Sequence, residues 1–205
     1  MGRFKVKKQD MFIDMTPMSD VMVLLLTFFM LTATFVKDEP VKVNTPGSVS
    51  EIKIPEKNLL TIYVEKNGKV YMSMDSPENM RKLGHQMSDD GSLSMSADQV
   101  KAFSEVSMFG TPLKLTTGWL ASDQKNNILT KDPAAGIPCD SINDELQVWV
   151  KAARTALGDG MDNMRIAIKA DATTSYKVIK NVMNSLRAIH EDRYNLITSL
   201  KAEEK

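Results

Sequence analysis

One acidic residue lies inside the most apolar stretch of this sequence. Residues 15–36 read MTPMSDVMVLLLTFFMLTATFV, and Asp20 is their only charged side chain. A carboxylate is costly to bury in such surroundings and is found there mainly where protons or ions pass. The alternative is local, with Thr16 as N-cap, Pro17 at the first helical position and Asp20 near the positive end of the helix dipole. The chemistry of the residues alone leaves both interpretations open.

Two threonines lie in register with this aspartate. Thr27 and Thr34 follow Asp20 by seven and fourteen residues, which places all three near one face of a helix. A polar seam is unfavourable against lipid, so we expect this face to meet protein or a water-filled cavity. For each threonine an alternative stays open, in which its hydroxyl bonds the backbone carbonyl four residues earlier.

Residues 15–36 are expected to form the element that carries these side chains. As a helix they would be about 33 Å long, enough to cross a hydrocarbon core of about 30 Å. The stretch is too long for the apolar part of a cleaved signal peptide, and residues 37–40 offer no small-residue cleavage site. The basic residues of the tail at 1–14 predict a cytoplasmic N-terminus. We therefore expect a single-pass anchor, with the rest of the chain on the far side of the membrane, which for a bacterium is the periplasm.

Composition excludes several classes of protein. The 205 residues carry 26 basic and 26 acidic side chains, so the overall charge does not predict a nucleic-acid partner. The sequence has no zinc-type cluster of cysteine and histidine and no phosphate-binding glycine loop. Its single cysteine, Cys139, has no partner for an intrachain disulfide and is expected to be an unpaired loop thiol. We expect neither a cofactor nor a metal site.

Beyond the membrane segment the sequence predicts one α+β domain. A polar linker with three prolines covers 37–57, and its Val-Lys-Val at 41–43 suits an edge strand. The domain is expected at 58–200, followed by a short tail at 201–205. Periodicity and an Asn-Gly turn at 67–68 predict these elements: strands at 59–64 and 69–74, a helix at 142–157 after Ser141, a strand at 164–169, a helix with an apolar stripe from Tyr176 to Ile189, and a strand at 194–197. This order predicts an antiparallel or mixed sheet with helices on one face.

A segment at about 83–138 interrupts this pattern and is interpreted as an insertion. Its glycines, prolines and aspartates predict loops with short helices, one of them at 96–106 with Ser96 as N-cap. A species-specific contact surface and a loop of no special role are both compatible with its sequence. Its role therefore stays open.

No residues in the soluble part predict catalysis. His85 falls in the insertion, and His190 is better explained as a cation near a helix C-terminus than as an acid or base. Asp171 follows a strand and precedes a helix, which favours a turn or capping role. Because no nucleophile and base can be paired, we do not expect an enzyme with an active site of its own.

Three segments resemble the ExbD/TolR family. The first is IDMTPMSDVM at 13–22, which leads into the apolar stretch, and the second is VKVNTP at 41–46. The third begins with IKAD at 168–171 and continues through VIKNVMNSLRAIHEDRYNLIT at 178–198. The chain departs from the family in having the insertion, and in lacking the usual glycine between the last helix and the last strand.

The resemblance implies a subunit of a proton-driven motor. Asp20 matches the family's single essential transmembrane aspartate, which would bind and release protons, and Thr27 and Thr34 would line or support the proton path. The implied partners are an ExbB-like polytopic ring, a second ExbD-like chain and a TonB-like periplasmic protein, with peptidoglycan as a further candidate. The implied role is to energise TonB-dependent outer-membrane transport with the proton-motive force. Two alternatives stay open: a TolR-like subunit of the Tol–Pal envelope system, and a membrane-tethered periplasmic binding module without a proton role.

Overall fold

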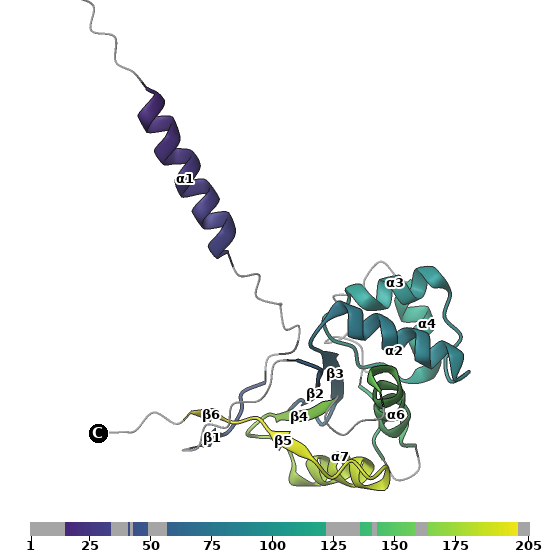
Figure 1. Cartoon of the computed structure of the whole chain (residues 1–205). Helices are drawn as coiled ribbons and strands as arrows, with labels where there is room; N and C mark the ends of the chain where they lie inside the picture. The colour runs from purple at the N-terminus through teal and green to yellow at the C-terminus, as the bar shows by residue number, and fades with distance from the viewer. Residues whose placement is uncertain are drawn as a thin grey trace, which may run out of the picture. The chain divides into compact units, whose positions relative to one another are not determined.

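The chain divides into two compact units, Met1–Lys37 and Asp38–Lys205. The computed structural model describes residues 15–33, 41, 43–48, 57–121, 136–140, 143–158 and 164–200 (Figure 1).

Helix α1, Thr16–Thr32, is the element described in the first unit. Its large apolar side chains are exposed on every side, from Leu25 at 53% to Leu31 at 87%. A helix that is apolar all round requires a surrounding of protein or lipid. Among the described residues there is no helix with both the length and the apolar character needed to cross a membrane. The expected span at 15–36 therefore stays a prediction, and its last three residues lie outside the described part.

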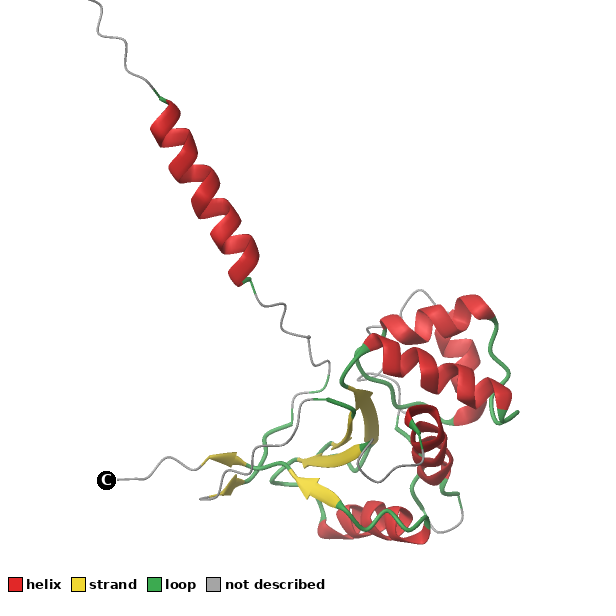
Figure 2. Ribbon diagram, in the orientation of Figure 1, coloured by secondary structure: helices red, strands yellow, loops and turns green. Residues whose placement is uncertain are grey.

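A four-stranded mixed sheet forms the centre of the second unit (Figure 2). The strands lie in the order β3–β2–β4–β5 and comprise β2 (Leu59–Val64), β3 (Val70–Met74), β4 (Arg165–Ala170) and β5 (Tyr194–Leu196). Strands β2 and β3 are antiparallel, joined by the predicted Asn-Gly turn, in which Gly68 has a φ of +79°. Strand β4 runs parallel to both β2 and β5. The predicted α+β domain with a mixed sheet is confirmed.

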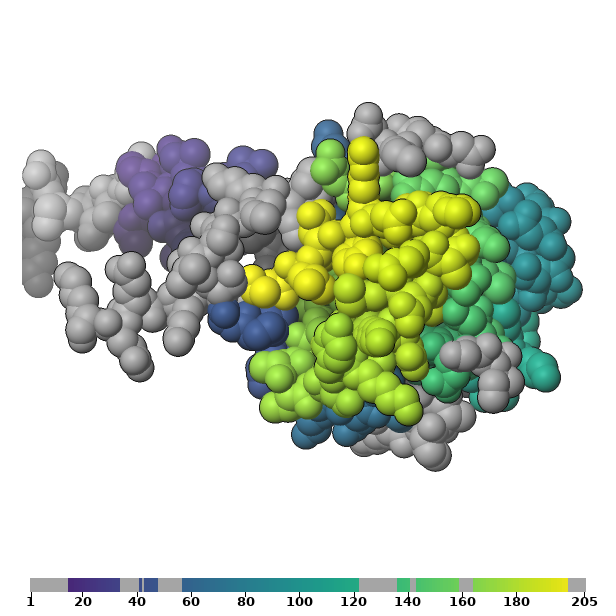
Figure 3. Space-filling model, turned by 90° about the horizontal axis from the view of Figure 1, so that it is seen from below, coloured from purple at the N-terminus to yellow at the C-terminus, as the bar shows by residue number. Residues whose placement is uncertain are grey.

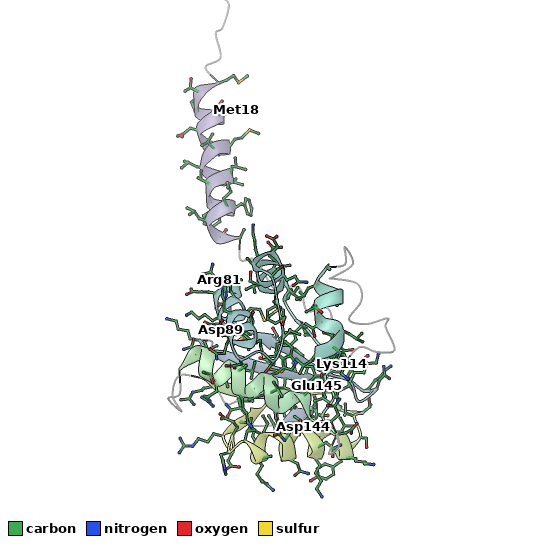
Figure 4. The ribbon with its side chains drawn as sticks, turned by 90° about the vertical axis from the view of Figure 1, so that its right-hand side faces the viewer. Met18, Arg81, Asp89, Lys114, Asp144 and Glu145 are labelled. Carbon is green, nitrogen blue, oxygen red and sulfur yellow. The ribbon has the colours of Figure 1, made fainter. Side chains whose placement is uncertain are left out.

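Three helices cover one side of this sheet: α2 (Pro77–Asp89), α6 (Glu145–Leu157) and α7 (Tyr176–Ala188). Figure 4 shows α6 between α2 and α7, in front of the strands. Leu60, Ile62 and Val64 alternate along β2 and are fully buried, which gives the sheet a continuous apolar row. Trp149 of α6 stacks on Phe103, with 5.9 Å between the ring centroids. The core therefore extends from the sheet through α6 into the insertion.

The insertion contains helices α3 (Ala97–Glu105) and α4 (Leu113–Ala121). Ser96 caps α3 as predicted, in a reciprocal capping box with Gln99. Helix α2 was not predicted, and the expected start of the insertion at Leu83 falls inside it. The signal for α2 was present, because Ser76 accepts a hydrogen bond from the Asn79 N–H and is followed by a proline in the first turn.

The insertion also covers the outer edge of β3. Met72 and Phe109 exchange two backbone hydrogen bonds, of 2.7 and 2.9 Å. The Ile137 N–H donates to the Val70 carbonyl at 2.8 Å. An exposed sheet edge invites pairing with other chains. These bonds therefore satisfy the backbone of β3 within the molecule.

The second part of the linker lies against the domain. Val41 is buried, and Asn44 forms backbone hydrogen bonds to the Asp171 carboxylate at 3.1 Å and to the Ala172 N–H at 2.8 Å. The strand in this segment is β1 (Gly47–Ser48), which pairs parallel with β6 (Ser199–Leu200). Val41 and Val43 lie outside any strand. The prediction of an edge strand at 41–43 was thus placed several residues too early.

One predicted boundary and one predicted burial in the helical layer were wrong. Helix α6 begins at Glu145 with Asp144 as N-cap, rather than after Ser141, because Asp144 first pairs with Cys139 in an isolated β-bridge. Tyr176 was assigned to the buried stripe of α7, but it is the first residue of the helix and is 71% exposed.

Candidate functional site

The local geometry of α1 does not support a capping role for Asp20. Met15 is the N-cap residue and has no side-chain capping bond, so the expectation of Thr16 as N-cap was wrong, and Thr16 is the first helical residue. Pro17 follows it inside the first turn, which contains no acidic residue. Asp20 lies in the second turn, whereas the influence of the helix dipole falls off within the first.

Polar side chains near Asp20 share one face of α1. Thr16, Ser19, Asp20 and Val23 line a shallow hollow on the helix surface. Thr27 follows Asp20 by two turns, and its hydroxyl donates to the Leu24 carbonyl at 2.9 Å. The threonine hydroxyl is therefore satisfied locally, three residues back rather than four, while its oxygen keeps the capacity to accept a bond. Thr34, the third member of the predicted seam, lies outside the described residues.

Asp20 is the only ionisable side chain between Thr16 and Thr32. Helix α1 therefore cannot relay a proton to a second titratable group of its own. Any proton that reaches this carboxylate must arrive from water or from a group on another element. The predicted roles of Asp20, Thr27 and Thr34 stay predictions.

Asp171 holds a turn, as its position in the sequence suggested. Its carboxylate accepts bonds from the Thr173 N–H at 2.9 Å and from the Thr173 hydroxyl at 2.6 Å. It also accepts the bond from the Asn44 N–H. The Thr173 hydroxyl, the Thr173 N–H and the Asn44 N–H lower the pKa of this carboxyl below its ordinary 3.8, because all three favour the charged form. Asp171 therefore joins the linker to the loop before α7.

A cleft of about 470 Å³ lies where α7 ends, between the end of α6 and the starts of β4 and β5. Arg154 and Glu191 form a bidentate ion pair in it, with Nε and Oε1 2.6 Å apart, and both side chains are largely buried. Arg154 also donates to the Met164 carbonyl at 3.1 Å. This pair was not predicted, since 37 residues separate its members and no local pattern relates them.

His190 lines the same cleft and adopts a left-handed backbone conformation, with a φ of +62°. Helices often end with such a residue, which is usually a glycine. His190 therefore adopts a backbone conformation that a glycine would take more readily. Its place after the end of α7 agrees with the predicted structural role, whereas His85 lies exposed on α2.

Cys139 is a free thiol, as predicted, but it is buried. Burial, followed by the charges of Asp140 and Asp144, raises the pKa of this thiol to about 11. A thiol of this kind is a weak nucleophile at neutral pH, since only the thiolate reacts. Within the ranges that the structure describes, no three His, Cys, Asp or Glu side chains come together in a group able to hold a metal ion.

Comparison with known proteins identifies the family. The sequence model described as "Biopolymer transport protein ExbD/TolR" matches residues 7–201, which is nearly the whole chain. The chain is also 28% identical over 108 residues to the biopolymer transport protein exbD2 of Vibrio cholerae, a match that covers 48% of this chain and 77% of that protein. No solved structure matches. This chain belongs to the ExbD/TolR family, as the resemblance indicated.

Proposed function

We propose that this protein is an ExbD-like subunit of an inner-membrane, proton-driven motor. In this proposal α1 is part of a helix that crosses the membrane, with residues 1–14 in the cytoplasm and the second unit in the periplasm. The observation that carries the proposal is the position of Asp20. It is the sole ionisable side chain of α1, it lies beyond the first turn, and the apolar side chains around it are exposed on every side of the helix. Such a residue is a functional site by default in a membrane helix.

The proposed mechanism uses Asp20 as the proton carrier. A carboxylate that enters an apolar enclosure is more stable when protonated, because the neutral form loses less solvation. Protonation would let α1 move within a surrounding ring of helices. Release of the proton on the other side of the membrane would then prevent α1 from moving back. Each proton supplies about 2.3 kcal/mol per 100 mV and about 1.4 kcal/mol per pH unit. Several protons are therefore required for a large movement of the second unit.

The proposed partners follow from this mechanism and from family membership. An ExbB-like polytopic ring would enclose α1, a second ExbD-like chain would complete the dimer, and a TonB-like periplasmic protein would receive the work. The Vibrio relative is named as an ExbD-type biopolymer transport protein, which supports the choice of an ExbD-like role in this proposal. Peptidoglycan is a further candidate for contact. The second unit would transmit force and carry no active site of its own.

Replacement of Asp20 tests the proton role. Asp20→Asn keeps the size and polarity of the side chain but removes its titration. We therefore expect the rate of energised outer-membrane uptake in a strain carrying this variant to fall at least 100-fold, which corresponds to about 2.7 kcal/mol of activation free energy. Met18→Asn is the matched control, since it introduces the same amide on the opposite side of the helix, two residues earlier, and leaves Asp20 in place. Undiminished uptake with Asp20→Asn, at wild-type protein levels, would contradict the proposal.

Affinity purification from native membranes tests the choice of motor. We expect an ExbB-like polytopic protein and a TonB-like protein to purify with the chain. Recovery of Tol–Pal components in place of the TonB-like protein would reassign the chain to the TolR-like role. Recovery of the chain without a polytopic partner, together with active Asp20→Asn, would favour a tethered binding module.

A further inference from the structure

Cations gather on one face of α7. Lys177, Lys180 and Arg187 are exposed, and at 100° per residue they fall within about 80° of one another around the helix axis. The helix contains no acidic residue. Val182 and Leu186 on the opposite side are fully buried, so packing against the core holds the cationic face outward. Figure 3 shows this side of the molecule, with α7 in yellow-green at its centre.

These cations have no carboxylate partner within the described residues. The ion pairs there are Glu78–Lys82 on α2 and Arg154–Glu191 in the cleft. On α2 the acidic and basic side chains neutralise each other one turn apart, which is the usual arrangement of a solvated helix. The chain as a whole has a net charge of zero. The exposed face of α7 is therefore locally positive and attracts anions, with Asp140, which accepts a hydrogen bond from the Asn181 side chain of this helix at 3.5 Å, as an acidic neighbour.

The cleft where α7 ends carries further cations. Arg165 and Arg193 line it, and both side chains are exposed. The bidentate pair of Arg154 with Glu191 shows how a carboxylate is held by a guanidinium group in this cleft. Arg165 and Arg193 offer the same planar set of donors, without a carboxylate partner among the described residues. Asp192 is the other acidic residue of the cleft wall and reduces its positive charge.

We propose that the exposed face of α7 and this cleft together bind an extended acidic segment of a partner polypeptide. The helix is about 20 Å long, which matches about six residues of extended chain. Acidic side chains of the segment would meet Lys177, Lys180 and Arg187 along the helix, and one carboxylate would enter the cleft. Tyr176 is 71% exposed one turn before Lys180, where its ring would pack on the same segment. A concave guanidinium site suits a single mobile side chain better than a flat lipid surface.

This surface is independent of the proton chemistry of α1, so its test does not require a working motor. The full chain in uncharged lipid nanodiscs would be titrated into a fluorescent peptide of about eight residues that alternates glutamate with serine, and into the same peptide with glutamine for glutamate. We expect saturable binding of the acidic peptide that weakens as salt rises. Comparable binding of the glutamine peptide would overturn the proposal.

Substitutions then locate the site. In the triple variant Lys177→Gln, Lys180→Gln, Arg187→Gln we expect binding to weaken about tenfold, since each exposed cation contributes about 0.5 kcal/mol. The pair Arg165→Gln, Arg193→Gln is expected to weaken it further. All five side chains are exposed, so folding should be retained, and circular dichroism would verify it.

A matched control removes the same charge elsewhere. Arg81, Lys101 and Lys114 are exposed on α2, α3 and α4, and their combined replacement by glutamine should change the affinity less than about twofold. An equal loss in this control would mean that binding depends on net charge alone and would overturn the proposal. Binding of α7 to phosphatidylglycerol vesicles but not to the peptide would also overturn it.

Discussion

At the scale of single residues, the proposed proton transfer depends on Asp20 and on the groups that must surround its side chain. The sequence left a helix cap and a proton carrier equally open, and the structure places the residue one turn too far into α1 for a cap. The Thr27 hydroxyl donates its hydrogen bond to the Leu24 carbonyl. In this conformation it can therefore take part in a proton path only as a hydrogen-bond acceptor. A helix with one titratable group and with large apolar side chains exposed on every side requires a surrounding of protein or lipid.

Gly110 is a second residue whose role depends on a close contact. A Cβ atom added there would lie 2.2 Å from Cδ1 of Tyr71, a fully buried ring. Gly110→Ala should therefore lower the free energy of unfolding by about 1–3 kcal/mol, because neither the ring nor the backbone can move freely in a packed core. Chemical denaturation of the purified chain, followed by tryptophan fluorescence, would measure the loss.

Gly118→Ala is the control for this substitution. Gly118 lies in α4, and an added Cβ would meet nothing within 4 Å. Alanine is favoured over glycine in a helix by up to about 1 kcal/mol, so this variant should be as stable as the wild type or more so. Equal destabilisation by both substitutions would show that the contact with Tyr71 is not the cause.

At the scale of elements, Glu145 connects the insertion to the layer of helices. Its buried carboxylate accepts the Leu113 N–H at the start of α4 at 2.7 Å, and the Asn143 side chain at 3.2 Å (Figure 4). A negative charge at a helix N-terminus satisfies a free backbone donor and the helix dipole together. Glu145 therefore holds α4 against α6, across 32 residues of sequence.

We expect Glu145→Ala to lower stability by about 1–3 kcal/mol, because it leaves the Leu113 N–H without its partner. Hydrogen exchange should locate the loss in α4, whose amides would exchange faster than those of β2 or β4. Glu145→Gln keeps an acceptor oxygen and should lose less. Glu105→Ala, an exposed position at the end of α3, should leave the exchange of α4 unchanged. Unaltered protection of α4 in Glu145→Ala would refute the assignment.

At the scale of the whole molecule, Asp171 controls how the linker lies on the domain. The pKa of its carboxyl is lowered by Thr173 and by the Asn44 N–H, so the charged form stabilises the docked linker. This contribution is present above the ordinary pKa of 3.8 and is lost as the pH falls through the lower folded value. Docking of residues 41–48 is thereby sensitive to acid.

Hydrogen exchange at the Asn44 amide tests this connection. After correction for intrinsic exchange, protection should fall as the pH drops below 3.8, and in Asp171→Ala it should be lost at neutral pH. Asp171→Asn retains an acceptor oxygen and should keep part of the protection. Asp89→Ala, at the end of α2, is the control. Full protection of Asn44 in Asp171→Ala would show that burial of Val41 and the β1–β6 pairing suffice.

Local sequence patterns predicted the turns and caps that are held together by bonds between neighbouring residues. The Asn-Gly turn at 67–68, the capping box from Ser96 to Gln99 and the turn at Asp171 are made by neighbouring residues, so their signals are complete within a few positions. The same is true of the apolar stretch around Asp20. Hydrophobic periodicity then predicted the order of strands and helices in the domain.

Only the tertiary structure decided the contacts between distant residues. Arg154 with Glu191, Glu145 with Leu113 and Gly110 with Tyr71 each join segments that the sequence does not relate. Packing also moved the start of α6 to Glu145, since Asp144 pairs with Cys139 first. The physical reason is the same in each case: these positions are fixed by which surfaces meet after the chain has folded, whereas turns and caps are fixed by bonds within one turn of backbone.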